Sequence, residues 1–168
     1  MKFTTKYPSP VGELLLASDG EHLTGLWLAG QKYYGAGLPT GAATQDSLPI
    51  FAQTKQWLDD YFAGKNPNLH SLPLSFCGSK FRQDIWQLLL EIPYGEVVTY
   101  GQLAKEYGAR FGRKTAARAV GGAVGRNPIS IIVPCHRVVG ANGLTGYAGG
   151  LSAKRFLLEL ERTADNSD

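Results

Sequence analysis

Cysteine is almost absent from the 168-residue sequence: only Cys77 and Cys135 occur, far apart in the chain. This scarcity excludes a scaffold stapled by disulfides and is typical of a protein kept in a reducing compartment. Long hydrophobic runs are missing too. No segment approaches the roughly 20 apolar residues that cross a bilayer, and the N-terminal residues lack the apolar part of a signal peptide. We therefore expect a cytoplasmic protein that contacts no membrane.

Charged residues make up only 18% of the chain, whereas hydrophobic residues make up 43%. This balance supplies a sizeable core and excludes wholesale disorder. The 21 glycines and 9 prolines follow no period, which excludes collagen-like and low-complexity sequences. The length suits one ordinary domain or two small ones.

Acidic residues are nearly missing from residues 97–137, which contain Glu106 and seven lysines and arginines. This stretch carries a charge sum of +6, whereas the remainder of the chain has a small acidic excess. A basic cluster is typical either of a solvated surface or of a surface that binds the phosphates of nucleic acid. Charge alone leaves both interpretations open.

The first third of the chain has the pattern of an antiparallel meander. Short strand-like runs separated by Gly and Pro turn signals cover Lys2–Tyr7, Gly12–Ala17 and Leu23–Leu28. Apolar residues at helical spacing predict a helix over Leu48–Phe62, followed by an extended connector over Leu69–Phe76. We place a domain boundary after this connector, which gives domains of residues 1–76 and 77–168.

The second part of the chain is predicted to be mainly helical. Ser79 caps a helix that ends before Pro93, and Thr99 caps a short helix that Gly108 ends. A basic loop then leads to a helix over residues 115–124, in which Arg118 is the one long side chain among Ala, Gly and Val. Two such helices fit a helix-turn-helix. Ile129–Val133 is predicted to be a buried strand and Leu151–Arg162 the last helix.

The two cysteines have different surroundings. Cys77 lies in an apolar connector and is predicted to be a small buried hydrophobe. Cys135 follows Pro134 and precedes His136 and Arg137, and a nearby cation lowers the pKa of a thiol and so favours the nucleophilic thiolate. Neighbouring residues on a strand point apart, so His136 would act through a water or at a turn of the chain. Glu161 is a candidate for orienting His136.

Five segments of the sequence resemble motifs of the O6-alkylguanine-DNA alkyltransferases, also called methylated-DNA–protein-cysteine methyltransferases. They occur in the same order along the chain as the motifs of that family. The segments are Ile92–Tyr100, Ala116–Gly121, Arg126–Pro128, Pro134–Val138 and Gly146–Leu151. The resemblance is close over residues 76–161 and weaker before them. It implies an α+β chain: a small RNase-H-like α/β domain over residues 1–76, then a mainly helical domain with a helix-turn-helix of winged-helix type over residues 77–168.

The resemblance also implies DNA repair by direct reversal of damage. An alkyl group would pass from O6 of guanine, or O4 of thymine, to Cys135 in one irreversible step, after the base is flipped out through the minor groove. The partner would be double-stranded alkylated DNA, bound by a monomer that associates with the nucleoid if the source is bacterial. No cofactor and no metal are implied, and His22 and His70 are expected to be surface or core residues rather than ligands.

Five residues receive catalytic roles from the resemblance. Cys135 would accept the alkyl group, His136 would deprotonate Cys135 through a water, and Glu161 would polarise His136. Asn127 would hold the hinge between the recognition helix, which the resemblance places at Ala116–Gly121, and the active site. Tyr100 would crowd the phosphate on the 3′ side of the target and protonate the leaving guanine.

Two further groups of residues are implied to contact DNA and the flipped base. Arg118 would fill the gap that the flipped nucleotide leaves in the stack. The other DNA contacts would come from Tyr100, Thr99, Ala119, Gly122 and Arg126. The guanine pocket would be lined by Val138, Tyr147, Ala148 and Gly149.

The chemistry agrees with this resemblance. An alkyl group on O6 of a stacked base is out of reach of a protein thiolate in line for displacement, so the base must leave the stack. Extrusion needs a basic surface, a wedge and a pocket, and the residues above supply each of them. Three alternatives remain. They are a non-catalytic alkylated-DNA-binding protein, a redox-sensing helix-turn-helix regulator and a thiol hydrolase. The thiol of Cys135 argues against the first of them.

Overall fold

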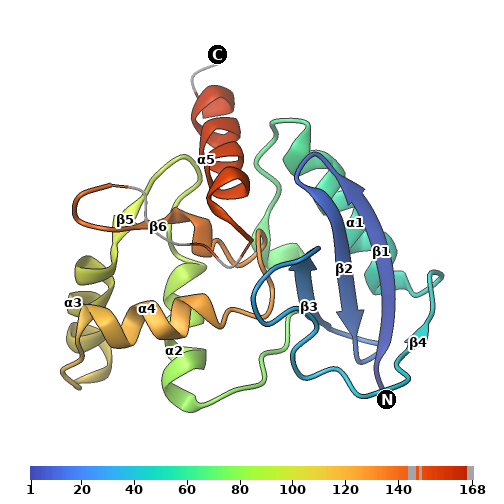
Figure 1. Ribbon diagram of the computed structural model, residues 1–168, viewed down its shortest axis with the longest axis horizontal. Coiled ribbons are helices and arrows are strands. Elements are labelled where there is room, and N and C mark those ends of the chain that lie inside the picture. The colour runs from blue at the N-terminus through green and yellow to red at the C-terminus, as the bar shows by residue number, and fades with distance from the viewer. Residues whose placement is uncertain (144–146, 148, 166–168) are drawn as a thin grey trace.

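The computed structural model describes residues 1–143, 147 and 149–165, and it places a sheet-rich N-terminal part beside a helical C-terminal part (Figure 1). The N-terminal elements are β1 (Phe3–Ser9), β2 (Gly12–Ser18), β3 (Leu23–Leu28), β4 (Ala43–Thr44) and α1 (Pro49–Phe62). The strand order is β3-β2-β1-β4, with antiparallel β1–β2 and β2–β3 pairs and a short parallel β1–β4 pair. The predicted meander and helix are confirmed.

One face of this sheet is apolar because side chains alternate along each strand. Leu16 on β2 lies opposite Thr5 on β1 and Leu26 on β3, and all three are buried. Leu14 repeats the arrangement two residues earlier, opposite Tyr7 and Leu28. The helix α1 lies across the sheet in Figure 1 and contacts β1, β2 and β3, so this face forms the first part of the core.

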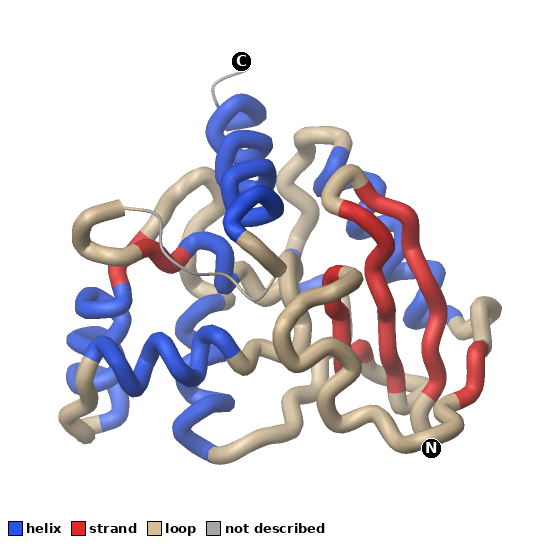
Figure 2. Tube along the Cα trace, in the orientation of Figure 1, coloured by secondary structure: helices blue, strands red, loops and turns tan. Residues whose placement is uncertain are grey.

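Short helices make up most of the C-terminal part, as the tube in Figure 2 shows. The connector before it contains η1 (Leu69–Ser71). The C-terminal elements are α2 (Lys80–Leu89), β5 (Val98–Thr99), α3 (Tyr100–Phe111), α4 (Ala117–Gly125), η2 (Cys135–Arg137), β6 (Val138–Val139) and α5 (Leu151–Asp165). α2, α3 and α4 pack against one another, and β5 pairs with β6 in parallel. The predicted fold class is confirmed: a sheet-rich domain is followed by a helical one that contains the α3–α4 pair.

Two of the predicted helix caps are present, and one predicted helix end is wrong. The Ser79 side chain accepts a hydrogen bond from Arg82 N, and Thr99 and Gln102 form a capping box at the start of α3. α3 does not end at Gly108 but continues to Phe111, and its C-cap Gly112 has φ 69°. Aromatic packing beyond Gly108 explains the extension, because the Phe111 ring lies 5.0 Å from that of buried Tyr107.

Ile129–Val133 is buried as predicted but is not a strand. Ile131 has φ 72°, and the run turns back on itself with Val133 N donating to Ile129 O. A single bridge joins Ile129 to Leu26 of β3. A positive φ at Ile131 is incompatible with extended backbone, so a full strand does not form.

The connector over Leu69–Phe76 is extended only in its second half. It begins as η1, and a bridge then joins Leu74 to Leu23 of β3. The prediction that Cys77 is buried is wrong, because its side chain is exposed. The apolar contact in this segment is made by the preceding residue, since the ring of Phe76 packs 5.5 Å from that of Trp86.

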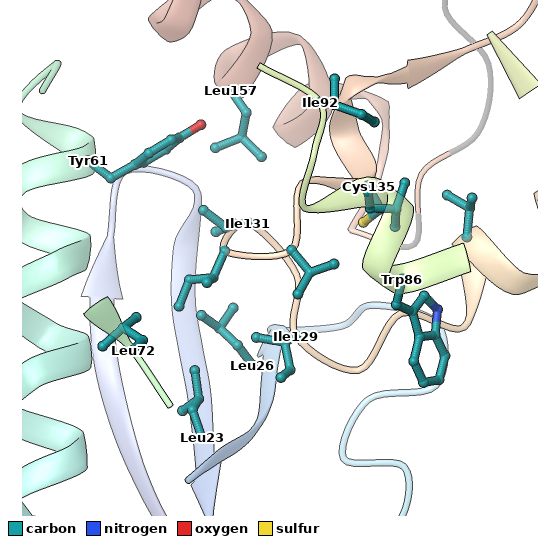
Figure 3. Close-up of a cluster of buried hydrophobic side chains, with 14 of the residues drawn as sticks. Leu23, Leu26, Tyr61, Leu72, Trp86, Ile92, Ile129, Ile131, Cys135 and Leu157 are labelled. Atoms are coloured by element: carbon teal, nitrogen blue, oxygen red, sulfur yellow. The ribbon is translucent and has the colours of Figure 1, made fainter. Parts of the chain in front are cut away.

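The buried side chains form one continuous core that joins the two parts (Figure 3). It runs from Leu23 and Leu26 under the sheet, through Ile129 and Ile131, to Trp86 and Cys135. The Trp86 indole donates to Ala123 O of α4 over 2.8 Å, which satisfies its buried N–H. Cys135 is part of this packed core. Within the described residues, no helix has the length and hydropathy of a membrane span.

We expect Leu16→Ala to lower the free energy of unfolding by about 2–5 kcal/mol, because it opens a cavity between the sheet and α1. Leu15→Ala on the same strand is the matched control, since its half-buried side chain points to the other face. Chemical denaturation of both variants checks the difference. Equal losses would contradict the assignment of the core face.

Candidate active site

The loop that carries Cys135 is fixed by the side chain of Asn127. Asn127 Nδ2 donates to Val133 O over 2.8 Å, and Oδ1 accepts from Ile129 N over 3.0 Å. Asn127 is buried and directly follows the end of α4, whereas Val133 lies two residues before Cys135. One amide side chain therefore couples the end of the helix to the loop of the thiol, in the position predicted for the hinge.

Cys135 lines a cavity of about 370 Å³. Cys135 itself is only 4% exposed. Tyr100 of α3, Gly121 and Gly122 of α4, and Tyr147 line the same cavity. Its size is within the range of small-molecule sites. Arg118 is exposed on α4 about one helical turn before these glycines, so it lies on the same face of the helix as they do.

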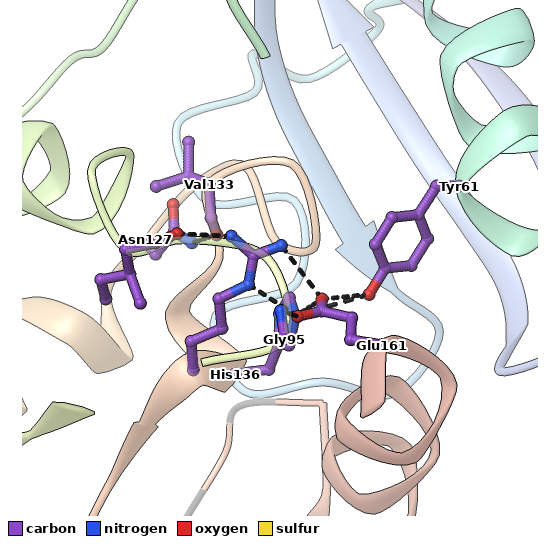
Figure 4. Close-up of polar contacts among 8 residues, drawn as sticks. Tyr61, Gly95, Asn127, Val133, His136 and Glu161 are labelled. Atoms are coloured by element: carbon purple, nitrogen blue, oxygen red, sulfur yellow. Dashed lines mark hydrogen bonds and ion pairs between the residues drawn. The ribbon is translucent and has the colours of Figure 1, made fainter. Parts of the chain in front are cut away.

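Cys135, His136 and Arg137 form the short helix η2 rather than a strand, and this turn brings the side chains of His136 and Arg137 to Glu161. Nε2 of His136 lies 2.6 Å from Oε2 of Glu161. Arg137 donates from Nε to Oε1 over 2.8 Å and from its terminal nitrogen to Oε2 over 3.2 Å. All three side chains are at most 5% exposed, so Glu161 is indeed beside His136, as predicted (Figure 4).

The protonation states in this cluster follow from burial and charge. Burial raises the pKa of Glu161, but hydrogen bonds and charge from His136 and Arg137 outweigh it and lower the pKa to about 2. Burial and the charges of Arg137 and Lys154 lower the pKa of His136 against the raising effect of Glu161, so the imidazole is neutral at pH 7. Its Nε2–H donates to the carboxylate. Nδ1 is then the basic nitrogen, and it has no hydrogen-bond partner among the described residues.

The expectation of a lowered thiol pKa is wrong for Cys135. Burial raises the pKa of this thiol, and hydrogen bonding from Asn127 and the charge of Lys154 oppose the rise only in part. Arg137, the cation nearest in sequence, is committed to Glu161 and to Ile92 O. The resting side chain is therefore a thiol, and its reaction as a nucleophile requires a base.

Two residues near this cluster were not predicted. Lys154 is buried on α5 and donates to Val138 O over 2.6 Å, and burial lowers its pKa. A sequence signal existed, because Lys154 and Glu161 share one helical stripe with buried Leu157. Tyr61 on α1 donates to Oε2 of Glu161 over 2.6 Å. Its place on the apolar side of a helix is typical of a core aromatic, so no sequence pattern distinguished it.

A loop of the sheet-rich part forms another wall of the cavity. Lys32 and Tyr33 line it, and Tyr33 has the unusual φ of 63° for a residue other than glycine. The guanidinium of Arg126 lies 3.9 Å from the centre of the Tyr33 ring, within cation–π range. Arg126 was predicted to contact DNA, and in this structure it joins the end of α4 to the loop.

The remaining predicted residues fall into three places. Ala119 and Gly122 are exposed on α4, and Thr99 is the half-buried N-cap of α3. Val138 is buried, and Gly149 lies so close to Tyr147 that an added Cβ would be 2.8 Å from its ring. Ala148 lies outside the described residues.

Neither of the two remote histidines belongs to a cluster that suits a metal. His22 pairs with Asp19 over 3.2 Å, and His70 is exposed. The part of the chain that the structure describes contains no group of three or more His, Cys, Asp or Glu side chains placed to hold a metal ion.

The Glu161 pKa makes a prediction about stability. Because its folded pKa is about 2, below the ordinary 4.5, Glu161 stabilises the fold above about pH 5, and this contribution of up to about 3 kcal/mol is lost as the pH falls towards 2. The stability advantage of the wild type over Glu161→Gln should shrink over that range, as measured by chemical denaturation at several pH values. Glu159→Gln, an exposed change on the same helix, is the control. A constant gap for Glu161→Gln would contradict the assignment.

Known proteins resemble this chain along nearly its whole length. Two family models match, the ribonuclease-like domain of 6-O-methylguanine DNA methyltransferase over residues 2–76 and its DNA-binding domain over residues 80–163. The methylated-DNA–protein-cysteine methyltransferase of Haemophilus influenzae is 49% identical over 161 residues, covering 95% of this chain and 86% of that protein. That of Mycobacterium leprae is 48% identical over 155 residues, with 92% and 88% covered.

Solved structures agree with these matches. The crystal structure of the Mycobacterium tuberculosis O6-methylguanine methyltransferase superposes with a TM-score of 0.85 at 42% identity, covering 100% of this chain and 97% of that one. A crystal structure of the M. tuberculosis protein in complex with DNA has a TM-score of 0.81 at 42% identity, with 97% and 93% covered. From these matches, together with the buried Cys135–His136–Glu161 cluster, the chain belongs to the 6-O-methylguanine DNA methyltransferase family.

Proposed function

We propose that this protein repairs DNA by moving an alkyl group from O6 of guanine to the sulfur of Cys135. The observation that carries the proposal is the presence of Cys135 in the lining of a cavity of about 370 Å³, next to a neutral histidine held by an ionised carboxylate. A non-catalytic DNA-binding protein has no use for this arrangement. The names of the relatives support the same reaction class.

Because the pKa of the Cys135 thiol is raised, the first step of the proposed reaction is its deprotonation. The Sγ proton passes through a water to Nδ1 of His136, and Glu161 remains ionised and stabilises the imidazolium that forms. The thiolate then attacks the alkyl carbon, so a C–S bond forms as the C–O6 bond breaks. The electron pair stays on guanine, which takes a proton from Tyr100. The product is a thioether without a leaving group at neutral pH, so each molecule acts once.

The DNA contacts follow from the exposed face of α4. We propose that Arg118 enters the base stack from the minor groove and fills the gap of the flipped nucleotide. Small residues at Ala119 and Gly122 let the helix backbone approach the groove closely. Thr99 and Arg126 lie at the start of α3 and the end of α4, where we propose that they contact the backbone of the DNA. Six of the seven basic residues over 97–137 are exposed, all except the buried Arg137, and they supply the positive charge that phosphates require.

The flipped base is proposed to occupy the cavity beside Cys135, against Val138, Tyr147, Ala148 and Gly149. We also propose a domain boundary after residue 76 and a monomer that works in the cytoplasm, near the nucleoid if the source is bacterial. Both O6-alkylguanine and O4-alkylthymine are proposed substrates, because each carries its alkyl group on an exocyclic oxygen of the base.

Incubation with duplex DNA containing O6-methylguanine should add one methyl group to Cys135 and no more. Peptide mass spectrometry locates the group and counts it per molecule. Cys135→Ser should gain none, whereas Cys77→Ser, which removes the exposed thiol, should react like the wild type. Repeated turnover, or methylation of Cys77 in place of Cys135, would overturn the proposed reaction.

Arg118→Ala should slow transfer from duplex DNA by about 10-fold or more, because an empty gap no longer stabilises the extruded state. Transfer from free O6-benzylguanine needs no base flipping and should change less than about 2-fold. The 10-fold loss on duplex DNA corresponds to a loss of about 1.4 kcal/mol of transition-state stabilisation, and the 2-fold limit on the free base corresponds to about 0.4 kcal/mol. Arg155→Ala, an exposed arginine on α5, is the control for lost charge. Equal losses on both substrates would exclude the wedge role of Arg118.

A further inference from the structure

We propose that Tyr61 is a positioning residue for the transfer reaction: its hydroxyl reaches across from the sheet-rich part, fixes the Glu161 carboxylate and sets the basicity of His136. This inference rests on the proposed function, in which His136 is the base. Nothing in the resemblance assigned Tyr61 a role.

The geometry of the hydroxyl is specific. Tyr61 Oη donates to Oε2 of Glu161 over 2.6 Å and lies 3.5 Å from Nε2 of His136 (Figure 4). Oε2 also accepts from His136 over 2.6 Å and from a terminal nitrogen of Arg137 over 3.2 Å. Tyrosine and histidine therefore compete for the same oxygen. Tyr61 is 1% exposed, so solvent does not replace its hydrogen bond.

The second carboxylate oxygen is occupied by other donors. Oε1 accepts from Nε of Arg137 over 2.8 Å and from Gly95 N over 3.2 Å. The buried carboxylate thus accepts hydrogen bonds from Tyr61, His136, Arg137 and Gly95, and removal of the Tyr61 hydroxyl leaves the other three as its donors. Hydrogen bonds from a hydroxyl to a carboxylate are among the stronger ones in proteins, so this contact has a measurable effect.

The ring of Tyr61 is held independently of its hydroxyl. It stacks on Trp57 with ring centres 5.5 Å apart and meets Phe62 and Tyr94 edge-on at 5.3 and 6.3 Å. Burial and the nearby charge of Glu161 raise the pKa of the phenol well above its ordinary value, so Tyr61 is a donor at every working pH. Tyr61→Phe therefore removes one donor and keeps the packing.

Loss of that donor has a definite direction. Oε2 would carry more negative charge towards the His136 Nε2–H, which favours the imidazolium and raises the His136 pKa. The other ionisable groups around the pair stay in place: Arg137 on η2, Lys154 on α5, Tyr147 and Cys135. The shift is therefore attributable to the hydroxyl alone.

Tyr7→Phe is a matched control. Its hydroxyl also donates to a carboxylate, Oδ1 of Asp59, over 2.6 Å, and Tyr7 is likewise buried in the sheet-rich part. It contributes nothing to the Glu161 carboxylate, whose donors are those described above. A general loss of stability would affect both variants alike, whereas an effect on the base would appear only in Tyr61→Phe.

The test measures the titration of His136 by ¹⁵N NMR and the acid limb of the single-turnover transfer rate. In Tyr61→Phe both should move to higher pH by about 0.5–1 unit, and in Tyr7→Phe neither should move. In the wild type, the Tyr61 hydroxyl proton should be visible, slow to exchange and coupled through space to His136. This last measurement holds even if Tyr61→Phe folds poorly.

Two results would overturn the inference: a folded Tyr61→Phe protein with unchanged titration and acid limb, or a wild-type hydroxyl proton that exchanges freely. Failure of the proposed function looks different. In that case the wild type itself would not methylate Cys135, while the NMR titration would still report whether Tyr61 controls His136.

Discussion

The structure around the thiol depends on one buried negative charge, the carboxylate of Glu161. It accepts hydrogen bonds from α1, from η2 and from the loop before β5, so a single side chain on α5 joins segments from the whole chain. A buried charge that loses its partners is costly, by several kcal/mol. Each donor is therefore constrained to its place, and the neutral form and orientation of His136 are consequences of that constraint.

The buried position of Cys135 keeps its side chain unreactive at rest and makes its activation depend on His136. Burial keeps the sulfur as a thiol, which is a weak nucleophile, and so limits reaction with chance electrophiles. Activation then depends on His136, whose Nδ1 is available because Nε2 is committed to Glu161. A protein proposed to act only once benefits from this arrangement, because a thiolate exposed at rest would be consumed without repair.

The cavity lies where the two parts of the chain meet. α4 contributes glycines, which leave room beside Tyr100, and the loop at Tyr33 contributes the facing wall, tied to α4 by Arg126. The sheet-rich part thus does more than support the helical part. It supplies one wall of the cavity and, through Tyr61, one donor to the carboxylate behind His136.

The sequence by itself determined the meander, the capped helices, the family and the set Cys135, His136, Glu161 and Asn127, because side-chain periodicity, local capping and motif order are readable along one chain. Tertiary structure alone decided what depends on burial and distant contacts. Packing of Phe111 extended α3 beyond Gly108, and desolvation raised the Cys135 pKa that a neighbouring cation was expected to lower. Tyr61 and Glu161 are 100 residues apart, and no local pattern specifies that they meet.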